Sequence, residues 1–163
     1  MAMQYDVKSK HVTTSSTAVS FATRLKNITV TSGTVSARNI GICDPTVYKS
    51  GTYARTSPST TVTVSITAHG LETGDRVFMD FTSGTAVDGV YTVTKVNDNS
   101  FTVTTVASTT TSGNVTFYSE VLVEIDTYNT VGLPILIPGE GIRCPNGIYV
   151  GLGSSVTATI YYG

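Results

Sequence analysis

Apolar residues recur at every second position along this chain, and no segment shows them at helical spacing over three turns. Period two is the repeat of a half-buried β-strand, whose successive side chains point to opposite faces. The clearest alternating sets are Val62, Val64 and Ile66; Val77, Met79 and Phe81; Tyr91 and Val93; and Phe101 and Val103. The pattern predicts an all-β protein, with Phe78 on the opposite side of its strand from Val77 and Met79.

The flanking segments alternate as well, in 121–125 and in 156–162. Leu25 stands at an odd position, whereas the apolar residues Ile28 and Val30 stand at even positions. This change in the alternation predicts a turn or bulge at Lys26-Asn27. Near the C-terminus, 148–152 and 156–162 read as two strands separated by Gly153-Ser154-Ser155. We expect these two strands to form a hairpin.

Turn-forming residues divide the middle of the chain into five short strands. They are His69-Gly70, Thr73-Gly74-Asp75, Ser83-Gly84, Asp88-Gly89, Asn97-Asp98-Asn99 and Ser112-Gly113-Asn114. The Thr- and Ser-rich stretches 55–61 and 108–113 have the composition of hinges. We therefore expect a small five-stranded, barrel-like β-domain at 58–118. It is inserted into a discontinuous outer domain of 1–57 and 119–163, a β-sandwich resembling a jelly roll.

Charge is scarce: 13% of residues are Asp, Glu, Lys or Arg, whereas 30 of the 163 are threonine. The net charge is −1 and the basic residues form no cluster, which argues against nucleic acid or an anionic membrane as a partner. The N-terminal segment lacks the apolar stretch of a signal peptide, so we expect synthesis in a reducing cytosol. Cys43 and Cys144 are then two buried thiols or, if their strands meet under oxidising conditions, a disulfide.

Candidate chemistry is sparse. His11 lies in the polar N-terminal segment and His69 at a turn before Gly70. Neither has a third ligand near it in sequence, and each is expected to be a turn-capping or a solvated histidine. Asp75, Asp80 and Asp88 carry oxygen ligands but do not follow the spacing of a calcium loop. Serine and threonine are frequent, but no sequence motif supplies the activating base that a nucleophile needs. The sequence predicts a protein with no catalytic, cofactor or metal site.

Two segments resemble bacteriophage proteins. The first runs HGLETGDRV over 69–77, then DGVYTV over 88–93 and SFTV over 100–103, and resembles a small β-module of phage virion proteins. The second, IPGEGI at 137–142 followed by GIYV at 147–150 and the terminal YYG, is similar to the ends of small virion proteins of tailed phages. Those proteins include capsid decoration and fibre-associated proteins. The resemblance implies a virion protein without catalytic residues.

Two function classes follow from the resemblance. In the first, the chain is a capsid decoration (cement) protein on the capsid exterior, with the major capsid protein as its partner. In the second, it is a tail- or head-fibre adhesin whose inserted module binds a host surface glycan. The short length and the lack of long repeats favour decoration.

The apolar run around Pro134 lacks polar alternation, so both sides of its strand need cover. A neighbouring subunit can supply that cover, and a trimer suits the threefold positions of a capsid. The expected interface residues are Leu133, Ile135, Leu136 and Ile137.

Overall fold

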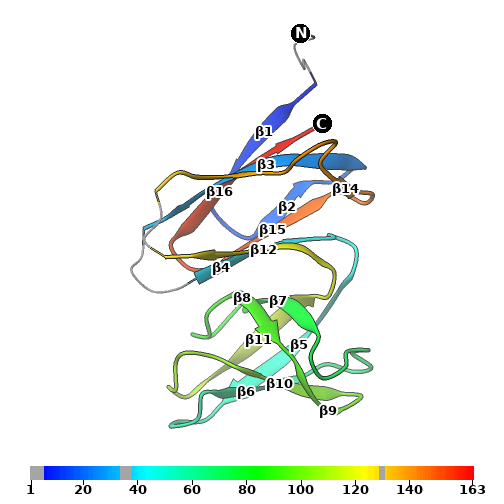
Figure 1. Cartoon of the computed structure of the whole chain (residues 1–163). Coiled ribbons are helices and arrows are strands. Elements are labelled where there is room, and N and C mark those ends of the chain that lie inside the picture. The colour runs from blue at the N-terminus through cyan, green and yellow to red at the C-terminus, as the bar shows by residue number, and fades with distance from the viewer. Residues whose placement is uncertain (1–5, 34–37, 129–130) are drawn as a thin grey trace. The chain divides into compact units, whose positions relative to one another are not determined.

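The computed structural model describes residues 6–33, 38–128 and 131–163, and within these ranges the chain forms strands and turns but no helix. The all-β prediction is confirmed. None of the described residues belongs to a helix that could cross a membrane. The strands divide into two compact units, Val47–Val121 and the described part of Met1–Thr46 together with Leu122–Gly163 (Figure 1). We call them the inserted unit and the outer unit.

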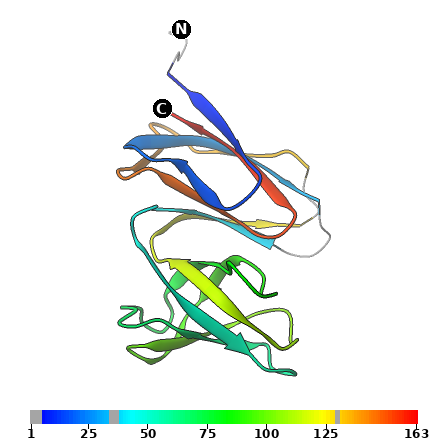
Figure 2. The same cartoon turned by 180° about the vertical axis from the view of Figure 1, so that it is seen from behind.

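The outer unit is a sandwich of two antiparallel sheets (Figures 1 and 2). One sheet has the order β1-β16-β3-β13, with β14 also paired to β3, and the other has the order β12-β4-β15-β2. The strands are β1 (Lys8–Val12), β2 (Ser16–Val19), β3 (Thr23–Ser32), β4 (Arg38–Cys43), β12 (Val121–Thr127), β13 (Leu133–Leu136), β14 (Ile142–Cys144), β15 (Ile148–Leu152) and β16 (Val156–Tyr162). The predicted β-sandwich is therefore present.

Both sheets contribute to the core of the outer unit. Leu25, Ile28 and Ile160 come from one sheet and Ile42 and Ile148 from the other, and all five are fully buried. Burying a side chain of this size stabilises a fold by roughly 1.5–3 kcal/mol. The alternating apolar positions thus supply the main force that holds the two sheets together.

The predicted bulge in β3 is confirmed. Ile160 pairs with Ile28 and Tyr161 with Asn27, but Tyr162 pairs with Leu25, so Lys26 is the extra residue. An extra residue reverses the parity of everything beyond it. Leu25 and Ile28 can therefore both face the core although an odd number of positions separates them.

The predicted C-terminal hairpin is wrong. β15 pairs with β2 and β4, whereas β16 pairs with β1 and β3 in the other sheet. Gly153-Ser154-Ser155 therefore carries the chain from one sheet of the sandwich to the other. Alternation shows which side chains face a core, but it does not show which strand is the neighbour.

The inserted unit is one antiparallel sheet of seven strands in the order β8-β7-β11-β5-β6-β10-β9. The two edge strands β8 and β9 follow each other in the chain with Val93 between them, so the sheet curls into a nearly closed barrel. The strands are β5 (Tyr48–Arg55), β6 (Thr61–Ser65), β7 (Arg76–Asp80), β8 (Gly89–Thr92), β9 (Thr94–Asn97), β10 (Ser100–Thr104) and β11 (Thr111–Tyr118). Its core is aromatic, with the rings of Phe101 and Phe117 edge to face at 5.8 Å.

The inserted unit is larger than predicted, with seven strands instead of five and a span of 47–121 instead of 58–118. β5 pairs with β11 along its whole length, from Tyr48 opposite Tyr118 to Arg55 opposite Thr111. The stretches 55–61 and 108–113, expected to be hinges, are connections within this unit or lie in β11. Residues 1–5, 34–37 and 129–130 of the predicted outer domain lie outside the described residues.

Two local predictions in the inserted unit are wrong. Phe78, predicted to lie on the other side of β7 from Val77 and Met79 and therefore to contribute clearly less to stability, is fully buried, as are Val77 and Met79. Ser112-Gly113-Asn114 is not a turn but part of β11. Gly113 is needed there because a Cβ at this position would approach the carbonyl oxygen of Ser83 to 2.5 Å.

Candidate functional site

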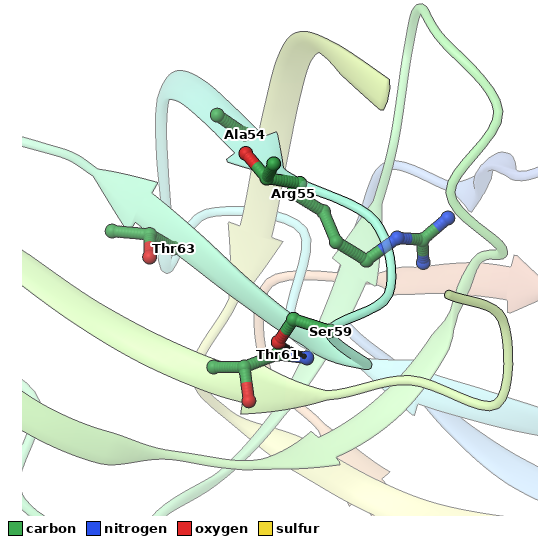
Figure 3. Close-up of a pocket in the computed structure, with 6 residues that line it drawn as sticks. Ala54, Arg55, Ser59, Thr61 and Thr63 are labelled. Atoms are coloured by element: carbon green, nitrogen blue, oxygen red, sulfur yellow. Dashed lines mark hydrogen bonds between the residues drawn. The ribbon is translucent and has the colours of Figure 1, made fainter. Parts of the chain in front are cut away.

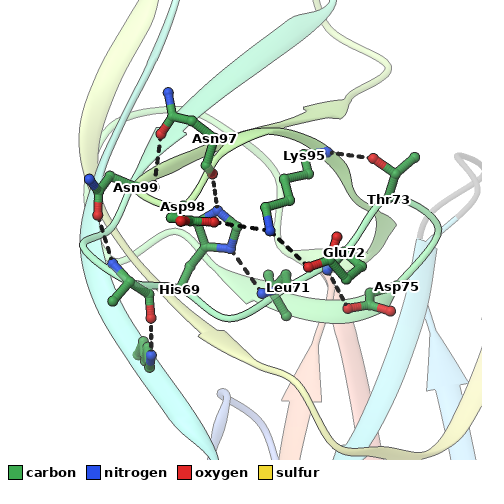
Figure 4. Close-up of polar contacts among 11 residues, drawn as sticks. His69, Leu71, Glu72, Thr73, Asp75, Lys95, Asn97, Asp98 and Asn99 are labelled. Carbon is green, nitrogen blue, oxygen red and sulfur yellow. Dashed lines mark hydrogen bonds and ion pairs between the residues drawn. The ribbon is translucent and has the colours of Figure 1, made fainter.

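His69, in the connection between β6 and β7, joins two loops of the inserted unit (Figure 4). Its Nδ1 accepts a hydrogen bond from the backbone N–H of Leu71 at 3.0 Å, so Nε2 carries the proton and donates to the carbonyl oxygen of Asn97 at 2.7 Å. The imidazole is buried, and its ring meets that of Phe101 edge to face at 5.1 Å. With both nitrogens in use, His69 is a structural residue that caps a turn, which is one of the two roles expected for it.

Polar contacts around His69 close the same two loops (Figure 4). The ammonium group of Lys95 lies 2.8 Å from Glu72 and 3.1 Å from Asp98, and both hydrogen bonds raise the pKa of Lys95. The carboxylate of Asp75 accepts a hydrogen bond from the backbone N–H of Glu72 at 2.8 Å. Gly74 supplies the positive φ of 103° that the turn between them needs. The HGL-x-x-GD segment thus connects two loops, and its polar side chains stabilise the fold.

Asp88 is a partly buried carboxylate near Asp80. Its Oδ1 accepts a hydrogen bond from the backbone N–H of Phe81 at 2.7 Å. Burial raises the pKa of Asp88 to about 6, and the charge of Asp80 adds to this, while the bond from Phe81 works against it. In the described ranges no group of three or more His, Cys, Asp or Glu side chains is placed to hold a metal ion.

Cys43 and Cys144 are both free and buried. Burial raises the pKa of each thiol, and the negative charge of Asp44 adds to the shift. Burial by itself would raise the pKa of Asp44 too, but hydrogen bonds from Thr46 and Asn146 outweigh it and lower that pKa. Thiols in such surroundings are poor nucleophiles, because the reactive thiolate is suppressed.

Arg55, at the end of β5, is a functional candidate that the sequence did not reveal. Its guanidinium is buried and donates from Nε to the carbonyl oxygen of Thr109 at 2.8 Å, from Nη1 to the Thr105 hydroxyl at 2.7 Å and from Nη2 to the Thr109 hydroxyl at 3.1 Å. Within the described part of the chain no carboxylate forms an ion pair with it. Gly51, Tyr53 and Arg55 alternate along one side of β5, and this pattern could have indicated that Arg55 faces inward. A charged residue, however, is normally expected to face solvent.

An open hollow of about 350 Å³ lies beside Arg55 on the inserted unit (Figure 3). It is lined by Ala54, Arg55, Thr56, Ser59, Thr61 and Thr63. The guanidinium of Arg55 extends away from the labelled alanine and hydroxyl residues, so its charged end does not face them. The surface that remains is one methyl group surrounded by hydroxyl-bearing side chains.

The predicted interface residues fall on the edge strand β13 of the outer unit and just beyond it. Ile135 and Ile137 are partly buried and pack against the sandwich core, so they are held within their own unit. Leu136 is 78% exposed and Leu133 is 40% exposed. The strand therefore has one side on its own core and leaves these two leucines open to solvent.

Comparisons with known proteins add little to the observations above. No protein-family model matches the chain, and no curated protein matches it. Among solved structures the chain has a likeness to "Phage phi92 endosialidase", with a TM-score of 0.40 and 26% identity. The likeness covers 56% of this chain and only 14% of that one. A similarity this weak establishes no shared function, and the proposals below rest on other observations.

Proposed function

We propose that this chain is a non-enzymatic structural component of a bacteriophage particle, made in the host cytoplasm. The resemblance of its HGL-x-x-GD-x-V and C-terminal segments to those of virion proteins supports this. So does the use of those residues, because His69 and Asp75 make the hydrogen bonds that close the loops of the inserted unit. Side chains occupied in this way stabilise a scaffold and need no cofactor.

We further propose that the protein decorates the capsid and fastens the shell, with the major capsid protein as its partner. The observation that carries this is a group of exposed apolar side chains at and beside the edge strand β13, which we call the apolar strip: Val131 at 87% exposure, Leu133 and Leu136. Exposed apolar side chains gathered at the edge of a stable sheet are typical of surfaces that bind another protein. The low charge of the chain leaves such a contact unopposed by repulsion.

The strip is suited to side-chain docking rather than to the addition of a further strand. Pro134, in the middle of β13, has no N–H and so interrupts the row of donors that an edge offers. A partner would contact Leu133 and Leu136 instead. In a trimer joined through this strip, each subunit would use another surface to contact the shell, and avidity would add to these individually weak contacts.

Capsid binding tests the proposal. Purified protein is mixed with capsids of the parent phage that lack it, and sedimentation and thermal melting of the shells are measured. We expect saturable binding at micromolar concentration and a higher melting temperature. Leu136→Asp should weaken binding at least about tenfold, since a charge buried at the strip without a partner would dissociate the trimer and remove its avidity. Val106→Asp, on an 81% exposed residue of the inserted unit, is the matched control and should bind normally.

Light scattering of the free protein tests the trimer. A trimer that Leu136→Asp dissociates is the expected result. A 17.2 kDa species at micromolar concentration would show that trimers do not preform, leaving decoration by monomers. Ile135→Asp is the weaker choice, because Ile135 also packs against the core of its own unit. Absence of binding to capsids by a folded protein would overturn decoration itself.

A further inference from the structure

The hollow beside Arg55 has the features of a small ligand site that decoration does not require. Its volume of about 350 Å³ lies at the lower end of the range of small-molecule pockets. Ala54 and Thr63 face each other across the β5–β6 ladder on the outer side of the sheet. Because Ala54 is the smallest residue of the lining, it leaves a recess between hydroxyl-bearing side chains (Figure 3).

Three hydroxyl groups at the hollow are unused. The side chains of Thr56, Thr61 and Thr63 make no hydrogen bond to any described residue. Elsewhere on the same face, by contrast, the hydroxyls of Ser50 and Thr116 bond to each other at 2.8 Å. A threonine hydroxyl can donate and accept at once, so these groups can bind a ligand that does the same.

The backbone that carries these hydroxyls is held in place from behind. Arg55 ties the end of β5 to the loop before β11 through Thr109. The backbone N–H of Ser57 bonds to the hydroxyl of Thr110, and Thr105 bonds to the carbonyl oxygen of Thr60. A site ordered before binding loses less conformational entropy when its ligand arrives. Arg55 is thus a positioning residue for the hollow.

The electrostatics select among ligands. Arg55 is the one charged residue in the lining, and its guanidinium points away and is engaged by Thr105 and Thr109 (Figure 3). Recognition of an acidic ligand normally uses an arginine fork or a lysine directed at the anion. No such group is presented here, so the complementary ligand is polar, rich in hydroxyl groups and uncharged.

We propose that this hollow binds a neutral sugar residue of a glycan. One face of the sugar ring, with its C–H groups, lies on the methyl groups of Ala54 and the threonines. The sugar hydroxyls exchange hydrogen bonds with Thr61 and Thr63. The proposal concerns the inserted unit and is independent of the apolar strip at β13, so capsid decoration stands or falls separately.

The test uses amide NMR spectra of the ¹⁵N-labelled full chain, titrated with lactose, maltotriose and chitotriose and with sialyllactose as the anionic counterpart of lactose. We expect at least one neutral sugar to shift the amides of Ala54, Thr61 and Thr63 with millimolar affinity. Sialyllactose should bind no better than lactose. No shift with any of the three neutral sugars, or binding of sialyllactose alone, would overturn the proposal.

Variants locate the site. Thr61→Val with Thr63→Val removes the two hydroxyls at constant shape and should weaken binding at least about fivefold. Ala54→Leu should fill the recess and abolish it. Thr52→Val is the matched control, because Thr52 lies on the same face of β5, opposite Ser65, and outside the lining. Equal loss in the control would show that the hollow is not the site, and unchanged capsid binding by all these variants would keep the two functions distinct.

Discussion

The imidazole Nε2 of His69 lies 2.7 Å from the carbonyl oxygen of Asn97, a residue 28 positions further along the chain. This bond, with the one from Leu71 to Nδ1, connects the loop before β7 to the turn between β9 and β10. The first prediction follows from it. His69→Leu should lower the free energy of unfolding by about 2–4 kcal/mol, because it leaves the Asn97 carbonyl and the Leu71 N–H unpaired in a buried place. Chemical denaturation measures the loss.

His11→Leu is the control for that experiment. His11 is exposed and contacts the hydroxyl of Thr159 at 3.0 Å on the outside of β1. We expect a change below about 0.5 kcal/mol, as for most surface substitutions. An equal effect of the two substitutions would contradict a special role for His69.

The second prediction concerns two phenylalanines of the inserted unit. Phe101 and Phe78 are both fully buried, so Phe101→Ala and Phe78→Ala should each destabilise the protein by roughly 3–5 kcal/mol. Phe21→Ala, at a ring that is 54% exposed, should cost far less. A clearly smaller effect at Phe78 than at Phe101 would contradict the full burial of the Phe78 side chain.

The third prediction is a pH dependence caused by Asp88. Its folded-state pKa of about 6 lies above the ordinary 3.8, so the folded state holds the proton longer than the unfolded state does. The stability from this group is therefore complete below about pH 4 and is lost as the pH rises to about 6. Asp88→Asn keeps the acceptor for the Phe81 N–H and removes the charge. It should stabilise the protein at pH 7 by about 1–3 kcal/mol and have little effect at pH 3.5.

Denaturation curves of both proteins at several pH values provide the measurement. The difference between them is the quantity to follow, because the other carboxylates titrate in both. Fresh protein is needed, since the substitution creates an Asn-Gly sequence that deamidates. A difference that does not vary with pH would contradict the raised pKa.

The fourth prediction concerns the two thiols. Cys43 and Cys144 are buried with raised pKa values, so a thiol reagent at pH 8 should label the native protein very slowly. After denaturation without reductant, both should react at once. A count of zero thiols in the denatured protein would instead mean that the two cysteines are joined.

The sequence by itself determined the class of fold and much of the local detail. Alternation determines which side chains are buried wherever one face of a strand packs on a core. The break in the alternation between Leu25 and Ile28 located the bulge at Lys26 before any partner strand was known. The turn at Gly74 and the position of His69 at a turn were also readable, because both depend on neighbours within a few residues.

The tertiary structure decided which strands are neighbours and therefore where the units divide. Because β5 pairs with β11, the inserted unit begins earlier in the chain than predicted. Gly153-Ser154-Ser155 connects two strands of different sheets, β15 and β16, which were predicted to form a hairpin. Phe78 and Arg55 are buried although their local sequence indicates exposure, and the recess at Ala54 exists only because Thr63 lies opposite it. Hydrogen-bonded pairing joins residues far apart in the chain, and the two-residue period is the same whichever partner a strand finds.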